Sequence, residues 1–227
     1  MHFTISEKLA LLALDDEKGT VVGDAQTALS YALAGGVIME LARNGFLEAE
    51  GDRISAKATD SEPANQVARM VYQEIKKQKK PRKMQSLLTN LVGFSSFKKE
   101  KDLILDSLVQ KGVLRKDQKT WFWVFKSDIF PEANARPEEQ LRLRLREVLL
   151  EDAGPDYDEV VVIALANACK LHKELFPDKE EREVAKARMK DITENNIFGQ
   201  AVNKAVQDIE TAIMVTLMAA TTVVVSS

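Results

Sequence analysis

The sequence is poor in the residues on which disulfide-stabilised proteins and metal sites depend. Its 227 residues include one cysteine, Cys169, and two histidines, His2 and His172. A single cysteine cannot form an internal disulfide, which fits a reducing compartment. The chain contains no Cys/His cluster with zinc spacing, no H-E-x-x-H or G-x-S-x-G motif and no phosphate-binding loop. We therefore expect a binding protein rather than an enzyme, with no metal and no cofactor.

A strong excess of one charge is also missing. The chain has 32 basic and 35 acidic residues, a net charge of −3 and a pI near 5.6, which disfavours a protein coated in cations for nucleic acid. Long apolar runs are missing too. The run at residues 212–225 is shorter than the roughly 20 residues that a membrane-spanning helix requires. We expect it to form a buried central helix with a frayed end rather than an anchor.

Helical spacing dominates the pattern that is present. Thr4 and Glu7 form a capping box, Asp24 is expected to cap the second helix, and Gly45 stands where a helix-ending glycine belongs. A Gly-Asp turn in FLEAEGDRISA predicts a short hairpin. Because strands are few and do not alternate with helices, the fold class is mainly α. Further helices are expected at 65–79, 82–91, 95–111, 137–150, 157–176, 180–193 and 196–222.

The chain contains a weak internal echo. VIMELARNGFLEAEGDRISA and LILDSLVQKGVLRKDQKTWFWVF both consist of an apolar helix, a glycine, an apolar-leucine pair, a polar turn and a strand. This order is typical of a winged-helix unit, and two copies are too few for a solenoid. We expect one domain over residues 1–227, with winged-helix-like units at about 25–60 and 95–127 and a helical half at about 137–225.

Two clusters of basic residues are the candidate binding groups. KKQKKPRK, at residues 76–83, includes Lys80 and Arg82, and a second cluster includes Lys98 and Lys101. The last two are three residues apart, so on a helix they point the same way. A solvated surface is the common explanation for such clusters. The functional explanation is an anion site for phosphates, on lipid headgroups or on nucleic acid.

TWFWVF is the most unusual stretch, with large apolar residues side by side from Trp121 to Phe125. In a strand, Trp121, Trp123 and Phe125 would share one face and Phe122 would lie on the other, so both faces are apolar. A strand of this kind needs cover on both sides. We expect self-association through a hairpin at about 116–127. The alternatives are burial within the monomer and contact with a membrane.

Several of these stretches together resemble the Golgi phosphoprotein 3 family. They are LLALDDEKG, ALAGGVIMELARNGFL, and LVQKGVL followed by an aromatic strand and an apolar helical half. The resemblance covers nearly the whole chain, and its most specific residues are Leu33, Gly36, Glu40, Leu41, Gly45 and Leu47. It implies a single-domain helical bundle around a central apolar helix. Eukaryotic members bind phosphatidylinositol 4-phosphate on Golgi membranes and retain glycosyltransferases by binding their cytoplasmic tails.

The resemblance also implies where a headgroup would bind. The family's two basic residues, one helical turn apart, fall on Lys98 and Lys101. Its helix-two arginine falls on Ala34, and its loop aromatic falls near Ala25, so half of that site is missing. The chain also lacks the long basic insertion that eukaryotic members carry after helix two. This lack is typical of prokaryotic members. In the family, the hairpin after KGVL mediates self-association.

These observations favour a peripheral adaptor on the cytoplasmic face of a membrane. Its expected partners are anionic phospholipid headgroups, a second copy of the chain and the cytoplasmic tails of membrane proteins. The headgroup site is expected at Lys98, Lys101, Lys80 and Arg82, and the oligomerisation site at Trp121, Phe122, Trp123 and Phe125. The alternatives are a winged-helix-like nucleic-acid-binding protein, disfavoured by the net acidity, and an oligomerising structural protein.

Overall fold

The computed structural model describes residues 1–26, 28–93, 97–121, 125–195 and 204–215. Within these ranges the chain is mainly α-helical, with two small antiparallel sheets. Its helices are α1 (Ile5–Leu12), the 3₁₀ turn η1 (Gly23–Ala25), α2 (Leu29–Arg43), α3 (Gln66–Lys76), α4 (Met84–Gly93), α5 (Lys98–Gln110), α6 (Arg136–Leu150), α7 (Tyr157–Ala168), α8 (His172–Leu175) and α9 (Lys179–Asn195). A further helical stretch is described at 204–215. The strands are β1 (Leu47–Glu50), β2 (Arg53–Ala56), β3 (Arg82–Lys83), β4 (Asp117–Trp121) and β5 (Phe125–Ile129).

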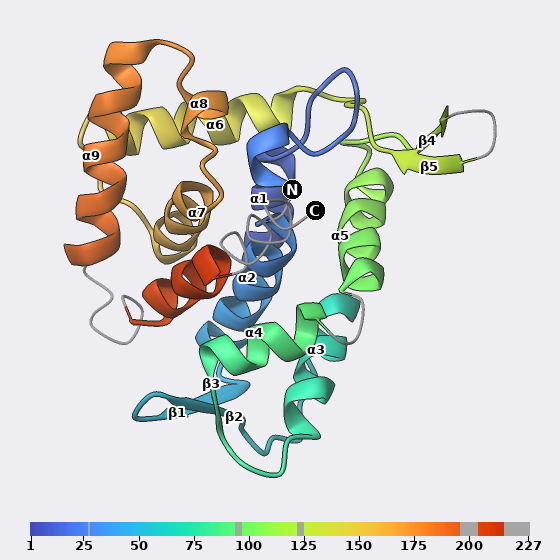
Figure 1. Cartoon of the computed structure of the whole chain (residues 1–227), viewed down its shortest axis with the longest axis vertical. Helices are drawn as coiled ribbons and strands as arrows, with labels where there is room; N and C mark the ends of the chain where they lie inside the picture. Colours follow the sequence, from blue (N-terminus) through green and yellow to red (C-terminus); the bar gives the residue numbers. More distant parts are fainter. Residues whose placement is uncertain (27, 94–96, 122–124, 196–203, 216–227) are drawn as a thin grey trace, which may run out of the picture.

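Three apolar helices form the centre of the core. α1 and α2 run through the middle of the molecule and the other helices surround them (Figure 1). α7 packs against both, and its stretch from Val160 to Ala166 is fully buried. Gly36 allows α1 and α2 to approach closely, because a Cβ at this position would lie 2.9 Å from the Ser6 hydroxyl. The Ser6 hydroxyl donates to the Leu33 carbonyl at 2.9 Å, so the same contact is also hydrogen-bonded.

The ends of α1 and α2 agree in part with the sequence prediction. The capping box of Thr4 and Glu7 is formed, and Gly45 adopts a φ of 77° after α2. The predicted cap at Asp24 is wrong. Asp24 lies within η1, and α2 begins later, with Ala28 as its N-cap. The physical reason is burial, since Ala25 and Ala28 are both drawn into the core before the helix starts.

The first predicted hairpin is part of a larger sheet. β1 and β2 pair antiparallel through a turn at Gly51, whose φ is 62°. β3 then pairs with β2, which gives a three-stranded sheet in the order β1-β2-β3. The helix predicted from Arg82 therefore begins two residues later, at Met84. Arg82 and Lys83 are strand residues because β2 offers an open edge to which they bond.

The second hairpin consists of β4 and β5 alone. Asp117 pairs with Ile129, and Trp121 pairs with Phe125 at the other end of the ladder. The hairpin projects from the body of the molecule beyond the end of α5 (Figure 1). Its β4 residues nearest the base, from Asp117 to Lys119, are exposed.

The second half of the chain is helical, with two departures from the sequence prediction. Pro137 lies in the first turn of α6, as expected. The single helix predicted over 157–176 is divided, because α7 ends at Ala168 with Cys169 as its C-cap, and Lys170 has a φ of 59°. Cys169 and His172 therefore lie on different elements, and Cys169 is fully buried.

The C-terminal helix is not the buried centre of the bundle within its described part, 204–215. Val206, Ile209 and Ile213 are buried, whereas Met214 and Val215 are about half exposed. The helix is thus amphipathic and covers one side of α2, where the Ile209 side chain lies against Gly35. Within the described ranges, no helix is both long enough and apolar enough to cross a bilayer.

Candidate functional site

A hollow of about 630 Å³ lies beside the first half of α5. Its walls come from α5, from the loop between α1 and α2, and from the end of β5 with the residues that follow. Lys98 and Lys101 both line it, and they lie one helical turn apart. Lys98 is exposed and Lys101 is half-buried. Neither has an ion-pair partner among the residues that the structure describes, so both ammonium groups are available to an anion.

The start of α5 adds to the positive potential around these lysines. The N-cap residue is Phe97, which makes no side-chain hydrogen bond to the first turn. The N–H groups of a first helical turn have no partner within the helix, and the helix dipole is positive at this end. Phe97 is buried, so the core fixes the position at which the helix begins.

Two carboxylates in the same hollow limit its positive charge. Asp102 and Asp128 both line it. Asp128 is already paired with Lys116, at 3.2 Å, and Lys116 also pairs with Asp106 at 3.0 Å. Asp102 therefore offsets part of the charge of the two lysines. The hollow is suited to a ligand that contacts both ammonium groups, rather than to strong long-range attraction of anions.

The loop between α1 and α2 closes one side of the hollow through backbone hydrogen bonds. Gly19, Thr20 and Val21 line the hollow. The Phe130 N–H donates to the Gly19 carbonyl at 2.8 Å, which joins the loop to the segment after β5. Gly19 has a φ of 60°, and a Cβ there would lie 2.2 Å from the Pro131 nitrogen. Only glycine therefore fits this contact.

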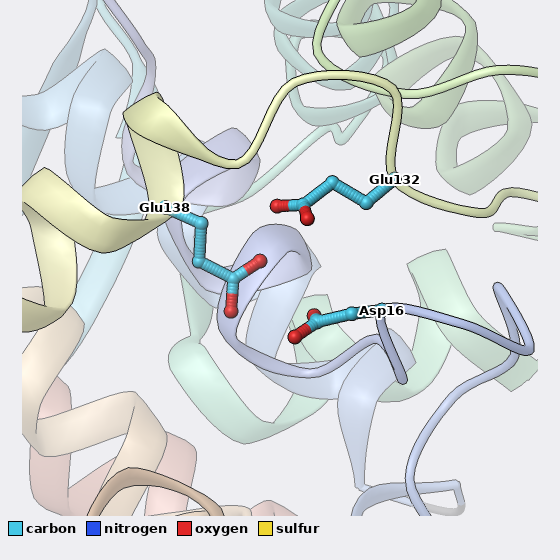
Figure 2. A group of neighbouring side chains, drawn as sticks. All are labelled: Asp16, Glu132 and Glu138. Atoms are coloured by element: carbon cyan, nitrogen blue, oxygen red, sulfur yellow. The ribbon is translucent and has the colours of Figure 1, made fainter.

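A cluster of three carboxylates lies at the other end of this loop. Asp16, Glu132 and Glu138 point toward one another, as Figure 2 shows, and one oxygen from each lies within 4.8 Å of the others. The Glu132 N–H donates to the Asp16 carbonyl at 3.0 Å. Glu138 is buried, and its carboxylate pairs with Arg142 at 2.7 Å. Asp16 is exposed and Glu132 is half-buried, so only Glu138 has lost most of its contact with water.

Burial raises the pKa of two carboxyl groups of the cluster, and the neighbouring carboxylates add to this effect. Burial raises the pKa of Glu138 to about 7, although the Arg142 guanidinium acts against this shift. Burial also raises the pKa of Glu132, and the neighbouring Asp16 carboxylate adds to the effect. Like charges that close cannot all be ionised without cost. No sequence pattern predicted this cluster, because Asp16 lies more than 100 residues from its partners.

The structure separates the four predicted headgroup residues into two groups. Lys98 and Lys101 share the hollow beside α5. Lys80 and Arg82 are exposed. Arg82 begins β3 of the three-stranded sheet and Lys80 lies just before it, and neither lines this hollow. Ala34 and Ala25, on which the family's other two positions fall, are fully buried. Neither can face a ligand in the hollow.

The predicted oligomerisation residues are described in part. Trp121 ends β4 and Phe125 begins β5, so both belong to the hairpin, as predicted. Phe122 and Trp123 lie outside the described residues. Self-association through this hairpin stays a prediction.

The family motifs now have structural roles. Gly36 is the close contact between α1 and α2, and Gly45 ends α2 in a left-handed conformation. The model of the Golgi phosphoprotein 3 (GPP34) family matches residues 5–209. The chain belongs to this family. The match extends from the first residue of α1 into the last described helix, so it covers both sheets and the α5 hollow. A search of curated proteins found no match to this chain.

Proposed function

We propose that this Golgi phosphoprotein 3 family member is a peripheral membrane protein that binds anionic phospholipid headgroups in the α5 hollow. The observation that carries the proposal is the pair of lysines, Lys98 and Lys101, one turn apart on one wall of a hollow and without ion-pair partners among the described residues. The uncapped first turn of α5 favours an anion at the same place. Membership of the family supports the lipid class.

The expected binding is weak and governed by net lipid charge. The resemblance implies a phosphoinositide such as phosphatidylinositol 4-phosphate, but Ala34 and Ala25 are buried where the family has its arginine and aromatic residue. Two lysines also lack the planar fork with which arginine grips a phosphate. With about 1 kcal/mol per basic residue near an anionic surface, two lysines contribute about 2 kcal/mol.

The role that follows is that of an adaptor rather than an enzyme. Bound to the cytoplasmic face of a membrane, such a protein could hold a second partner, for which the family resemblance implies the cytoplasmic tails of membrane proteins. The hairpin of β4 and β5 begins and ends beside the hollow, since Ser127 and Asp128 line it. Self-association through that hairpin would bring several weak headgroup sites to one membrane and increase avidity.

The decisive experiment is vesicle co-sedimentation of two charge-matched variants. Lys98→Glu with Lys101→Glu reverses the charge of the hollow, and Lys80→Glu with Arg82→Glu makes the same change in net charge near β3. On vesicles with anionic lipid at low salt, we expect the first variant to lose at least about thirtyfold in binding, which corresponds to about 2 kcal/mol. The second should retain most of its binding.

Three outcomes would contradict the proposal. Equal losses in the two variants would mean that diffuse surface charge attracts the lipid. Unchanged binding by the Lys98/Lys101 variant would remove the hollow from consideration. A salt-dependent shift of a labelled DNA duplex, together with no vesicle binding, would favour the winged-helix-like nucleic-acid alternative.

A further inference from the structure

A second cavity, of about 380 Å³, lies on the other side of α5 and is separate from the headgroup hollow. It is enclosed by the start of α1, the middle of α2, the start of α3 and the second half of α5. We call it the Glu40 cavity. Its volume falls within the range of small-molecule sites. The exposed side chains of Gln66 and Gln110 are among its lining residues, so the cavity is reached from the surface.

The Glu40 carboxyl lines this cavity without a partner. Glu40 is 8% exposed, and its side chain has no hydrogen bond or ion pair with any of the residues that the structure describes. The nearest cations are committed elsewhere. Arg43 and Lys8 both pair with Asp158, the latter at 3.4 Å. The Glu40 oxygens are not among the fully buried unpartnered atoms, so they face the open space of the cavity, where a ligand with a donor group can pair with them.

The only ammonium group among the lining residues is also committed. The Lys111 ammonium donates to both carboxylate oxygens of Glu7, at 2.7 and 2.6 Å, and to the His2 carbonyl at 3.1 Å. An ammonium has three donors, and these three acceptors use all of them. The cavity therefore offers no cationic donor to an anion. Asp106, a further carboxylate of the lining, is already paired with Lys116 at 3.0 Å.

Part of the remaining wall is apolar, and the rest is polar: Thr4, Ser6, Asn65, Gln66, Ser107 and Gln110. Four side chains with little exposure line the apolar part, from α2, α3 and α5: Val37, Val67, Leu103 and Ile104. A ligand that pairs with Glu40 and also contacts these four apolar side chains combines a positive charge with a short hydrocarbon chain. We propose that the Glu40 cavity binds an alkylammonium group, with the Glu40 carboxylate as its counter-ion and the apolar wall against its chain. The source is a free alkylamine or a lysine side chain of another molecule, which share this chemistry.

The charges around Glu40 give the site a pH dependence. The pKa of Glu40 is raised to about 7, chiefly by burial; the Asp158 and Glu7 carboxylates contribute to the rise, and Arg43 and Lys8 act against it. Below pH 7 the Glu40 carboxyl is mostly protonated when no ligand is bound, and an ammonium must displace this proton. Alkylamines stay protonated throughout this range. Affinity is therefore expected to rise about tenfold between pH 6 and pH 8, and binding should release a proton.

Isothermal titration with n-butylammonium chloride tests the proposal directly. We expect saturable binding to the full chain at pH 8, with affinity about tenfold lower at pH 6. n-Butanol, which keeps the chain and removes the charge, should bind at least tenfold more weakly. Equal binding of butanol, or no saturable binding of butylammonium at millimolar concentrations, would overturn the proposal and leave a cavity for water.

Matched variants assign the binding to this carboxyl. Glu40→Gln should reduce butylammonium affinity at least tenfold and remove its pH dependence. Glu100→Gln is the control, since Glu100 is also buried with an unpartnered oxygen but lines another hollow. Equal loss in both variants would contradict the assignment. If Glu40→Gln fails to fold, carboxyl ¹³C NMR of the unmodified protein decides, because the Glu40 pKa should fall on addition of butylammonium and an unchanged titration would exclude contact.

The two sources are distinguished with a capped Gly-Lys-Gly peptide and its Nε-acetyl-lysine counterpart. Binding of the first and not the second supports a lysine side chain as the ligand, and binding of butylammonium alone supports a free amine. Equal binding of the two peptides would overturn the requirement for an ammonium. Vesicle binding of Glu40→Gln should equal that of the unmodified protein, so this proposal and the headgroup proposal can fail separately.

Discussion

The two helix–hairpin units share one local plan but differ in what covers the hairpin. In the first, α2 ends at Gly45, with φ 77°, before β1 and β2. In the second, α5 is followed by Gly112, with φ 69°, and then by β4 and β5. The local chemistry of a helix, a left-handed glycine and a hairpin is therefore the same in both.

The first hairpin is held by neighbours on the same side of the molecule. β3 extends its sheet, and α3 packs against β2. Phe46, just before β1, meets the ring of Tyr72 edge-on at 5.7 Å, and the Tyr72 hydroxyl donates to the Lys57 carbonyl at 2.8 Å. The hairpin is thus fixed by apolar packing and by a hydrogen bond.

The second hairpin is held at its base. Lys116 pairs with Asp106 of α5 and Asp128 of β5, and its ammonium lies 5.4 Å from the centre of the Phe130 ring. The Arg115 N–H donates to the Pro131 carbonyl at 2.9 Å. The hairpin extends away from this base (Figure 1). The comparison teaches that the same local motif becomes part of the core or a projecting arm according to its tertiary neighbours.

The largest expected effect is at the support of the first hairpin. Tyr72→Ala should lower the free energy of unfolding by about 3–5 kcal/mol, because Tyr72 is 2% exposed and its removal leaves a cavity against Phe46. Tyr72→Phe keeps the ring and should cost about 1 kcal/mol for the lost hydrogen bond. Denaturant unfolding measures both. A loss below about 1 kcal/mol for Tyr72→Ala would show that the first hairpin is no better supported than the second.

The next effect sharpens the comparison at two left-handed glycines. Gly51 turns the first hairpin at φ 62° with open space around it, whereas Gly19 lies against the base of the second, at φ 60°. Gly51→Ala should cost about 1 kcal/mol for the conformation alone. Gly19→Ala should cost at least twice as much, because its Cβ would meet backbone atoms of Phe130 and Pro131. Equal losses in denaturant unfolding would mean that the loop between α1 and α2 shifts freely.

A third effect concerns the cluster of Asp16, Glu132 and Glu138, which lies at the base of the second hairpin. Burial holds the pKa of Glu138 at about 7, above the usual 4.5, so folding favours its protonated form. Its contribution to stability is complete below pH 4.5 and is lost as pH rises from 4.5 through 7, by about 3 kcal/mol. Glu40 acts in the same direction over the same range.

Glu138→Gln tests this contribution. Unfolding free energies at pH 5 and pH 7.5 should differ less in the variant than in the unmodified protein. Glu139→Gln, an exposed neighbour, should leave the difference unchanged. Identical pH dependence in all three proteins would show that Glu138 does not hold a proton near neutral pH.

The smallest effect on stability is expected at the second hairpin itself. Deleting residues 117–126, or changing Trp121 and Trp123 to Ser, should alter the free energy of unfolding by less than about 1 kcal/mol, because the hairpin projects from the core. Light scattering should find a smaller assembly. Ile54→Ser in the first hairpin is the control, since it should reduce stability without changing assembly size. An unmodified protein that is monomeric at tens of micromolar, roughly where weak interfaces of this size associate, would rule out self-association.

The sequence predicted best where local chemistry decides the structure. The capping box at Thr4, the glycine at Gly45 and the proline in the first turn of α6 need only a few neighbouring residues, and each is confirmed. The division of α7 from α8 was missed because Lys170 adopts a positive φ that its side chain does not predict. β3 was missed because two residues become a strand only beside the edge of β2.

The candidate site, like the fold, was predictable only where residues close in the sequence decide it. Lys98 and Lys101 could be paired because they lie on one helix. Lys80 and Arg82 could not be excluded, since their distance from the hollow depends on how the two sheets are placed. The Asp16 cluster and the unpartnered Glu40 gave no signal, because burial and long-range proximity are not visible in a sequence.

The sequence by itself determined the helical class, the family and the two helix–hairpin units, since these follow from periodicity, caps and glycines within short stretches. Only the tertiary structure decided which hairpin joins the core, which lysines share a hollow and which carboxylates become buried. The physical reason is the same in each case. Desolvation and packing depend on groups that are distant in the chain, and α1, α2 and α7 bring those groups together.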